Sequence, residues 1–214
     1  MFLSESRDAA DVLLKRGAEA ELRRSEFLGR PAVAKVRVPK EYRLPALDDE
    51  LRRSRIRMEA RLMADARGAG VAVPILYDID VARHTITMEF IDGPTAKEVL
   101  ERGGPPAVEV AREIGRIVGR LHRAGIIHGD LTTSNMILRE GRIVMIDFSL
   151  GGKADDAESR GVDLHLLREA LTSAHARAPT YYREVLRGYR EIMKTEAAAV
   201  IAKVREIESR GRYT

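Results

Sequence analysis

Two short apolar runs separated by four polar or small residues constrain the fold of this chain more than any other stretch. The runs cover 136–138 and 143–146, and Arg139-Glu140-Gly141-Arg142 lies between them. Runs of this length with a glycine between them are typical of a β-hairpin, because glycine adopts the positive φ that a tight turn requires. We therefore expect two antiparallel strands joined by a turn at Glu140 and Gly141.

The residues at the open end of this hairpin carry oxygen atoms that could bind a metal. A two-residue turn pairs Asn135 with Ile146 and so places Asp147 beside Asn135. Magnesium is commonly held by one or two carboxylates, together with phosphates and waters. Asp130 lies five residues before Asn135 and would accept a proton from a hydroxyl or a water. The pattern predicts phosphoryl transfer from a magnesium nucleotide, and the alternative is that these residues only form turns.

The bulk composition describes a soluble globular chain. Its 214 residues fit one large domain or two small lobes, with 44% hydrophobic and 33% charged residues. The absence of cysteine excludes disulfides and thiolate metal sites. Polar residues 4–8 interrupt any signal-peptide core, and no apolar run is long enough to cross a bilayer. We expect a cytoplasmic protein without membrane contact.

The charge of the chain favours an acidic partner. The formal net charge is +4 and the sequence pI is about 9.5, which suits RNA or an acidic protein. Aromatic residues make up only 5% of the chain and tryptophan is absent. A large base-stacking platform is therefore not expected.

The first part of the chain reads as a small antiparallel sheet with one helix. Strands are expected over 20–24 and 31–38, with a turn at 28–30. A helix is expected from about Glu50 to Ala69, with N-cap oxygens from Asp48-Asp49. Strands return over 71–91, with a turn near 82–84.

Asp92-Gly93-Pro94 marks the best lobe boundary, because turn residues there separate a sheet-rich part from a helical part. We expect a hinge at 89–93, an N-terminal lobe over 1–91, and a mainly helical lobe over 92–214. The second lobe would carry the loop over 128–135, called the catalytic loop below, and a basic tail. The expected helices of the second lobe are 106–124, 161–173, 179–194 and 195–209.

Six segments of the chain, read together, resemble a known family. They are Gly17-Ala18-Glu19-Ala20-Glu21-Leu22, Lys40-Glu41-Tyr42-Arg43, Pro45-Ala46-Leu47-Asp48, Glu59-Ala60-Arg61, the run from His128 to Asn135, and Gly161-Val162-Asp163-Leu164. The sequence resembles the eukaryotic-like protein kinases and, more narrowly, the Bud32 family of atypical kinases, which is related to p53-regulating kinase. His-Gly-Asp-Leu alone also occurs in aminoglycoside phosphotransferases and RIO-type kinases.

The resemblance implies an α+β fold of the compact, bilobal protein-kinase type, with a small antiparallel sheet and a helix in the N-lobe and a mainly helical C-lobe. It also implies an atypical serine/threonine kinase or ATPase that uses ATP and Mg²⁺. The family belongs to the KEOPS complex, which supports threonylcarbamoyladenosine (t6A) modification of tRNA. The implied partners are KEOPS subunits, chiefly Kae1 and Cgi121, with a possible tRNA contact.

The resemblance also implies a role for each matching residue. Lys35 would pair with the nucleotide phosphates and Glu59 would hold Lys35. Asp130 would be the catalytic acid/base, and Asn135 with Asp147 would bind magnesium. The remaining nucleotide contacts would come from the loop Gly17, Ala18, Glu19 and Ala20 and from the backbone of Glu89 and Ile91. Lys40 is the alternative to Lys35, but the alternating strand Val33-Ala34-Lys35-Val36 favours Lys35.

Three departures from ordinary protein kinases predict a slow enzyme. The N-terminal loop lacks a G-x-G-x-x-G motif, Gly129 stands where many kinases have arginine, and Ser149 replaces the glycine of Asp-Phe-Gly. We expect slow ATP hydrolysis or autophosphorylation that depends on a partner. His128 and Asp163 are expected to shape the catalytic loop rather than to take part in the reaction.

Two basic segments could form either a solvated surface or an RNA contact, and the sequence does not decide between these roles. They are the first helix, with Arg52, Arg53, Arg55, Arg57 and Arg61, and the tail, with Lys203, Arg205, Arg210 and Arg212. Two other functions also stay open. One is a kinase-like scaffold that binds RNA or a partner without turnover, and the other is a small-molecule phosphotransferase.

Overall fold

The computed structural model describes residues 12–211, and the described chain packs into two compact units. One unit holds the residues up to Ala60 together with Pro74–Phe90, and the other holds Arg61–Val73 and the residues from Ile91 onward. The lobe boundary after residue 91 stays a prediction. Within 12–211, no helix has both the length and the apolar character needed to cross a bilayer.

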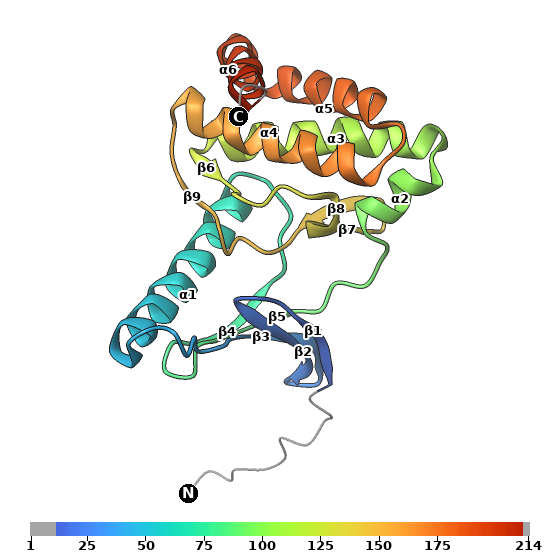
Figure 1. The fold of residues 1–214 in the computed structure, drawn as a ribbon. Coiled ribbons are helices and arrows are strands. Elements are labelled where there is room, and N and C mark those ends of the chain that lie inside the picture. The colour runs from blue at the N-terminus through green and yellow to red at the C-terminus, as the bar shows by residue number, and fades with distance from the viewer. Residues whose placement is uncertain (1–11, 212–214) are drawn as a thin grey trace, which may run out of the picture. The chain divides into compact units, whose positions relative to one another are not determined.

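The first unit is built on a five-stranded antiparallel sheet of order β1-β2-β3-β5-β4 (Figure 1). The strands are β1 (Leu13–Arg16), β2 (Ala20–Phe27), β3 (Arg30–Arg37), β4 (Leu76–Asp80) and β5 (Thr85–Glu89). The turn between β2 and β3 is Leu28-Gly29, with φ of 49° and 76°. Positive φ at both positions matches the right-handed twist of a hairpin. The antiparallel sheet is confirmed, although residues 71–75 are not in a strand.

Helix α1 (Pro45–Gly68) begins five residues earlier than the sequence predicted. Proline suits the first turn of a helix because its fixed φ is helical and its missing N–H would have had no partner there. Asp48 is therefore not an N-cap. It is buried, accepts a hydrogen bond from the Lys40 amide at 3.3 Å and pairs with Arg52 Nε at 2.7 Å. Its carboxylate thus fixes the segment that leads from β3 into α1.

The second unit is mainly helical, as predicted (Figure 1). Its helices are α2 (Ala96–Arg102), α3 (Gly104–Arg123), α4 (Ala157–Ala174), α5 (Ala178–Met193) and α6 (Glu196–Gly211). Its short strands are β6 (Ile126–Ile127), β7 (Met136–Arg139), β8 (Arg142–Met145) and β9 (Gly152–Lys153), with a 3-10 turn at Thr133–Asn135. Helix α2 was not predicted, although Thr95 and Glu98 form a capping box at its start.

Helices α3 and α5 pack against each other through glycine (Figure 1). A Cβ atom at Gly115 would lie 1.9 Å from the carbonyl oxygen of Val185, and one at Gly188 would lie 2.0 Å from that of Arg112. The backbones approach too closely for any side chain there. Gly119, one turn further along α3, also lies against Ile192 of α5.

Replacement of Gly115 by alanine is expected to lower the free energy of unfolding by about 2 kcal/mol, because the added methyl group forces the two helices apart. Gly68→Ala is the matched control, since a Cβ there meets no atom within 4 Å. The control is expected to be neutral or to stabilise by up to about 1 kcal/mol. Urea denaturation measures both variants, and equal effects would contradict this packing.

Candidate active site

The β7–β8 hairpin has the predicted register. Met136 pairs with Met145 and Arg139 with Arg142, so the turn is Glu140-Gly141 with φ of 50° and 77°. The pairing continues past the strands, because the Ile146 amide donates to the carbonyl of Asn135 at 3.0 Å. Asn135 and Asp147, both in the second unit, are therefore neighbours across the hairpin.

Asn135 is oriented by Asp130. Its Nδ2 donates to the carbonyl of Asp130 at 3.0 Å and to Asp130 Oδ2 at 2.8 Å. With the amide nitrogen engaged in this way, the oxygen Oδ1 is the atom that can bind a cation. The geometry thus suits the metal-binding role predicted for Asn135, which stays a prediction.

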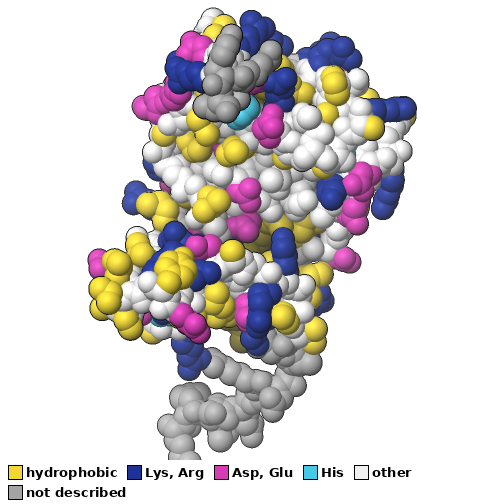
Figure 2. All heavy atoms as spheres, in the orientation of Figure 1, with side chains coloured by type: hydrophobic (Ala, Val, Ile, Leu, Met, Phe, Trp, Pro, Cys, Tyr) yellow, Lys and Arg dark blue, Asp and Glu magenta, His cyan; other side chains and the backbone are white. Residues whose placement is uncertain are grey.

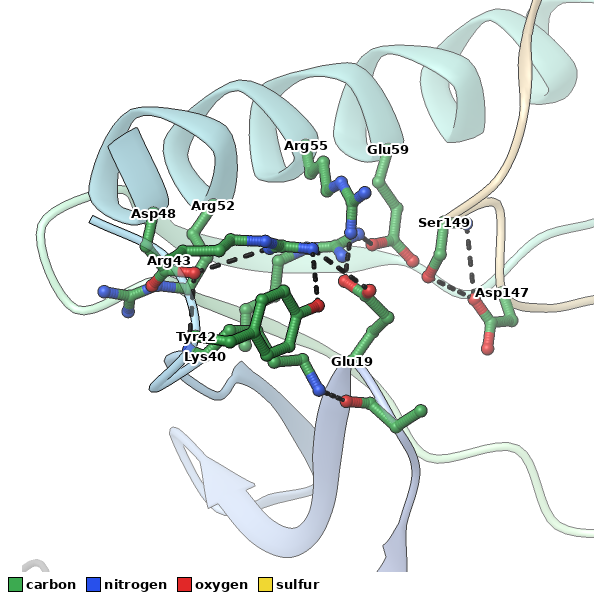
Figure 3. A network of polar contacts seen from close by, with 12 residues as sticks. Glu19, Lys40, Tyr42, Arg43, Asp48, Arg52, Arg55, Glu59, Asp147 and Ser149 are labelled. Carbon is green, nitrogen blue, oxygen red and sulfur yellow. Dashed lines mark hydrogen bonds and ion pairs between the residues drawn. The ribbon is translucent and has the colours of Figure 1, made fainter. Parts of the chain in front are cut away.

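Asp147 is oriented by Ser149. Ser149 Oγ donates to Asp147 Oδ1 at 2.5 Å, and the Ser149 amide lies 3.3 Å from the same oxygen (Figure 3). The Asp147 backbone is left-handed, with φ of 63°, a region that aspartate tolerates better than most residues. Ser149 thus adds a hydroxyl donor that glycine at this position would lack.

Asn135 and Asp147 supply too few ligands to hold a metal ion by themselves, but they suit magnesium, which also binds phosphates and waters. Across the described part of the chain, no group of three or more His, Cys, Asp or Glu side chains could hold an ion. One carboxylate from Asp147 and one amide oxygen from Asn135 leave most coordination positions to phosphates and waters. Magnesium is usually bound in this way.

Asp163, on α4, holds the backbone of the catalytic loop. Its Oδ2 accepts from the His128 amide and its Oδ1 from the Gly129 amide, both at 2.9 Å. Oδ2 also contacts His122 Nε2 at 3.1 Å, and the other ring nitrogen of His122 contacts Tyr189 OH at 2.9 Å. Asp163 and His122 are completely buried. The structural role predicted for Asp163 is confirmed.

Gly129 is required by both conformation and space. Its φ is 78°, and a Cβ there would lie 2.1 Å from the carbonyl oxygen of Leu150. The loop therefore packs against the segment that follows Asp147 and leaves no room for the arginine found in many kinases.

His128 is a buried structural residue, as predicted. Its Nε2 lies 3.1 Å from the Ile146 carbonyl, and its Nδ1 accepts from the Asp130 amide at 3.3 Å. These contacts describe a neutral ring with the proton on Nε2, since a carbonyl needs a donor and an amide needs an acceptor. Burial lowers the pKa of His128, and the nearby charge of Asp163 opposes that shift only in part.

The first unit contains a buried cluster of three charges. Lys35 Nζ lies 2.6 Å from Glu59 Oε1, and Arg37 Nη2 lies 2.7 Å from Glu59 Oε2. The alternative residue, Lys40, instead donates to the carbonyl of Ala18. Arg37 was not predicted, although residues i and i+2 of a strand share one face and Lys35 was expected to point inward. The phosphate-binding role of Lys35 stays a prediction.

Residues 17–20, which stand where other kinases have a glycine-rich motif, are held by Lys40 and by Arg55 of α1. The Gly17 amide donates to the Ala20 carbonyl at 2.9 Å. Glu19 accepts from Arg55, and Lys40 binds the neighbouring Ala18 carbonyl (Figure 3). This loop is therefore fixed by side chains of its own unit.

The remaining nucleotide-binding candidates are Glu89 and Ile91. Glu89 ends β5, and its amide donates to the Ile75 carbonyl at 2.8 Å. Ile91 is buried. Their predicted contact with adenine stays a prediction.

Most cations of the two basic segments have partners within the chain. Arg52, Arg53 and Arg55 pair with acidic residues, and so do Lys203 and Arg210 in the tail. Figure 2 shows basic and acidic side chains intermixed on the visible surface of the second unit. Arg57, Arg61 and Arg205 have no ion pair among residues 12–211, and Arg212 lies outside the described residues. The pairing favours a solvated surface for most of these residues.

Comparison with known proteins identifies the family. The RIO domain matches residues 41–161, which is more than half of the chain. The KEOPS complex subunit Bud32 of Pyrococcus abyssi is 45% identical over 210 residues, covering 94% of this chain and 96% of that protein. This chain belongs to the Bud32 family. The resemblance noted from the sequence is confirmed, and it extends over nearly the whole length of a Bud32 protein.

Bud32-like sequences also occur within longer proteins. The probable bifunctional tRNA threonylcarbamoyladenosine biosynthesis proteins of Methanothermobacter thermautotrophicus and Methanobrevibacter smithii are 46% and 42% identical to this chain. They match 94% and 95% of it, and the chain spans only 36% and 37% of their own length.

A solved structure confirms the α+β kinase-like fold. The Rio2 kinase of Chaetomium thermophilum, solved as an ADP/Mg²⁺-phosphoaspartate complex, superimposes with a TM-score of 0.64 at 18% identity. The match covers 91% of this chain and 70% of the Rio2 chain. At this identity the likeness concerns the fold alone.

The lowered pKa of His128 predicts a loss of stability in mild acid. The unfolded state takes up a proton at this residue as the pH falls below about 6.5, whereas the folded state resists protonation until a lower pH. The stabilisation is therefore complete above pH 6.5 and declines below it, by up to about 1.4 kcal/mol per pH unit. Urea denaturation between pH 5 and 7.5 measures the slope. In His128→Asn the slope is expected to be shallower, and identical slopes would contradict a neutral His128.

Proposed function

We propose that this Bud32 family member is an atypical kinase or ATPase that uses Mg-ATP and acts in threonylcarbamoyladenosine modification of tRNA. The observation that carries the proposal is the hydrogen bond from the Ile146 amide to the Asn135 carbonyl, which brings the backbone of Asp147 next to that of Asn135. The names of the relatives supply the biological setting, and the Rio2 complex with ADP and Mg²⁺ supports the choice of nucleotide and metal.

Each unit carries its own part of the proposed machinery. Asn135 Oδ1 and the Asp147 carboxylate would hold Mg²⁺, while Lys35 would neutralise phosphate charge and depend on Glu59 for its position. Bound magnesium would supply charge neutralisation on the phosphate oxygens. Asp130 would accept the proton of the attacking hydroxyl or water, and the hydrogen bond from Asn135 Nδ2 would hold its carboxylate in place.

We expect turnover below the roughly 1 to 100 per second of typical kinases. Glu19 and Ala18 are occupied by contacts to Arg55 and Lys40, so the loop offers less freedom to cover phosphates than a glycine-rich loop would. The expected partners are KEOPS subunits, chiefly Kae1 and Cgi121, and one of them would have to complete the phosphate site. A tRNA contact would use the unpaired Arg57, Arg61 and Arg205.

The carboxylate of Asp147 provides the most direct test. Asp147→Ala is expected to lower ATP turnover at least about a hundredfold, since it removes the only protein carboxylate proposed for the metal. The variant should still unfold cooperatively. Asp155→Ala is the matched control, because Asp155 is an exposed carboxylate of the same segment. Turnover is measured with the chain alone, with tRNA and with Kae1.

Unchanged turnover in Asp147→Ala would reject the proposed enzyme. A second variant distinguishes an enzyme from a scaffold. If Asp130→Asn binds its partners and supports full tRNA modification in a reconstituted complex, the chain acts as a binding module and phosphoryl transfer is not its useful reaction.

A further inference from the structure

The second unit contains a cavity of about 360 Å³. Its lining does not include the proposed metal ligands Asn135 and Asp147. One wall is the end of α2 with Leu100, Glu101 and Arg102, followed by the pair Gly103-Gly104. The other wall is the segment 174–177 with Tyr181 of α5. The volume is within the range of small-molecule sites.

The charges around this cavity favour an anion. Arg102 and Arg177 both line it, and neither has an ion pair to any residue in the described part of the chain. The one acidic side chain in the wall, Glu101, lies 3.9 Å from Lys97, which offsets its charge. Guanidinium groups suit phosphate because they present several N–H donors in one plane.

Two helices begin at the wall of the cavity. Gly103 is the N-cap residue of α3 and Arg177 is that of α5, and no side chain in the described part of the chain caps either helix. The C-terminal ends of α2 and α4 lie at the same walls and carry partial negative charge, so the helix ends offset one another and the arginines carry the preference for an anion. Prolines in both first turns remove backbone donors, so the hydrogen bonds to a ligand would come mainly from side chains.

His175 supplies an independent indication of a ligand. Its side chain forms part of the wall and is 6% exposed. Nε2 contacts Thr133 Oγ1 at 3.2 Å, whereas Nδ1 is buried and has no hydrogen-bond partner among residues 12–211. A buried polar atom without a partner is costly, and a ligand oxygen would provide one for an Nδ1–H donor.

The glycine at the start of α3 keeps the cavity open. Gly103 has a φ of 73°, and the atoms nearest to a Cβ there would be Arg177 Nη1 and Tyr181 OH, both at 3.9 Å. A larger side chain would be strained and would project toward these groups. Tyr181 OH already donates to the Leu100 carbonyl at 2.8 Å, which fixes the ring beside the cavity.

We propose that this cavity binds the phosphate group of a small phosphorylated molecule, through Arg102, Arg177 and His175. The hydrogen bond from His175 to Thr133 links the site to the catalytic loop, because Thr133 begins the 3-10 turn that ends at Asn135. A ligand on Nδ1 would thus contact the ring that holds the first residue of the turn leading to Asn135. The inference does not depend on the proposed enzyme activity.

Titration of the ¹⁵N-labelled full chain with inorganic phosphate, at constant ionic strength in chloride, tests the proposal. Saturable shifts are expected for the amides of Gly103, Gly104 and Ala176, with a further shift at Thr133. Arg177→Ala is expected to weaken phosphate binding about tenfold, whereas Arg183→Ala, an exposed arginine of the same helix outside the cavity, should not.

A second pair of variants tests His175. In His175→Asn the amide nitrogen can stand in for Nδ1 and should retain binding, while His175→Gln places its nitrogen nearer Nε2 and should lose it. Non-saturable shifts, or equal affinities for Arg177→Ala and Arg183→Ala, would overturn the proposal. So would a short RNA oligonucleotide that displaces phosphate and binds more tightly through Arg177, because the ligand would then be a polymer.

Discussion

The predicted chemistry depends on one backbone hydrogen bond, between the Ile146 amide and the Asn135 carbonyl at 3.0 Å. It extends the β7–β8 ladder by one residue and makes Asp147 the neighbour of Asn135. The register that allows this bond is set by the two-residue turn at Glu140 and Gly141, both with positive φ. A slip of one residue would turn every side chain of a strand to the opposite face, and the two oxygen ligands would separate.

A buried polar network holds the other side of the loop. The Asp163 carboxylate accepts hydrogen bonds from the amides of His128 and Gly129. It also contacts His122, whose other ring nitrogen contacts Tyr189 OH. Such a network is stable only when each member has a partner, so a change at one residue is felt at the others. His175 is an exception to this rule, because one ring nitrogen contacts Thr133 and the other has no partner in the described part of the chain.

The β7–β8 hairpin could be predicted from the sequence because its turn residues alone decide its register. The role of Asp163 in holding the catalytic loop came instead from the family resemblance. The predicted start of α1 was wrong because Asp48 looks like an N-cap residue, whereas the helix already begins at Pro45 and the Asp48 carboxylate binds Lys40 and Arg52 instead of capping it. Arg37 was missed although it shares a strand face with Lys35, because its partner Glu59 lies 22 residues away on α1. The cavity beside His175 was missed because it arises where segments far apart in the sequence, 100–104 and 174–177, meet.

The most direct measurement of the central claim uses Mn²⁺ as a paramagnetic substitute for Mg²⁺, with a non-hydrolysable ATP analogue and the ¹⁵N-labelled full chain. The account predicts that Mn²⁺ broadens the amide signals of Asn135, Ile146 and Asp147 before others of the second unit, and that excess Mg²⁺ restores them. Sharp signals for these three residues, with broadening centred elsewhere in the chain, would contradict it.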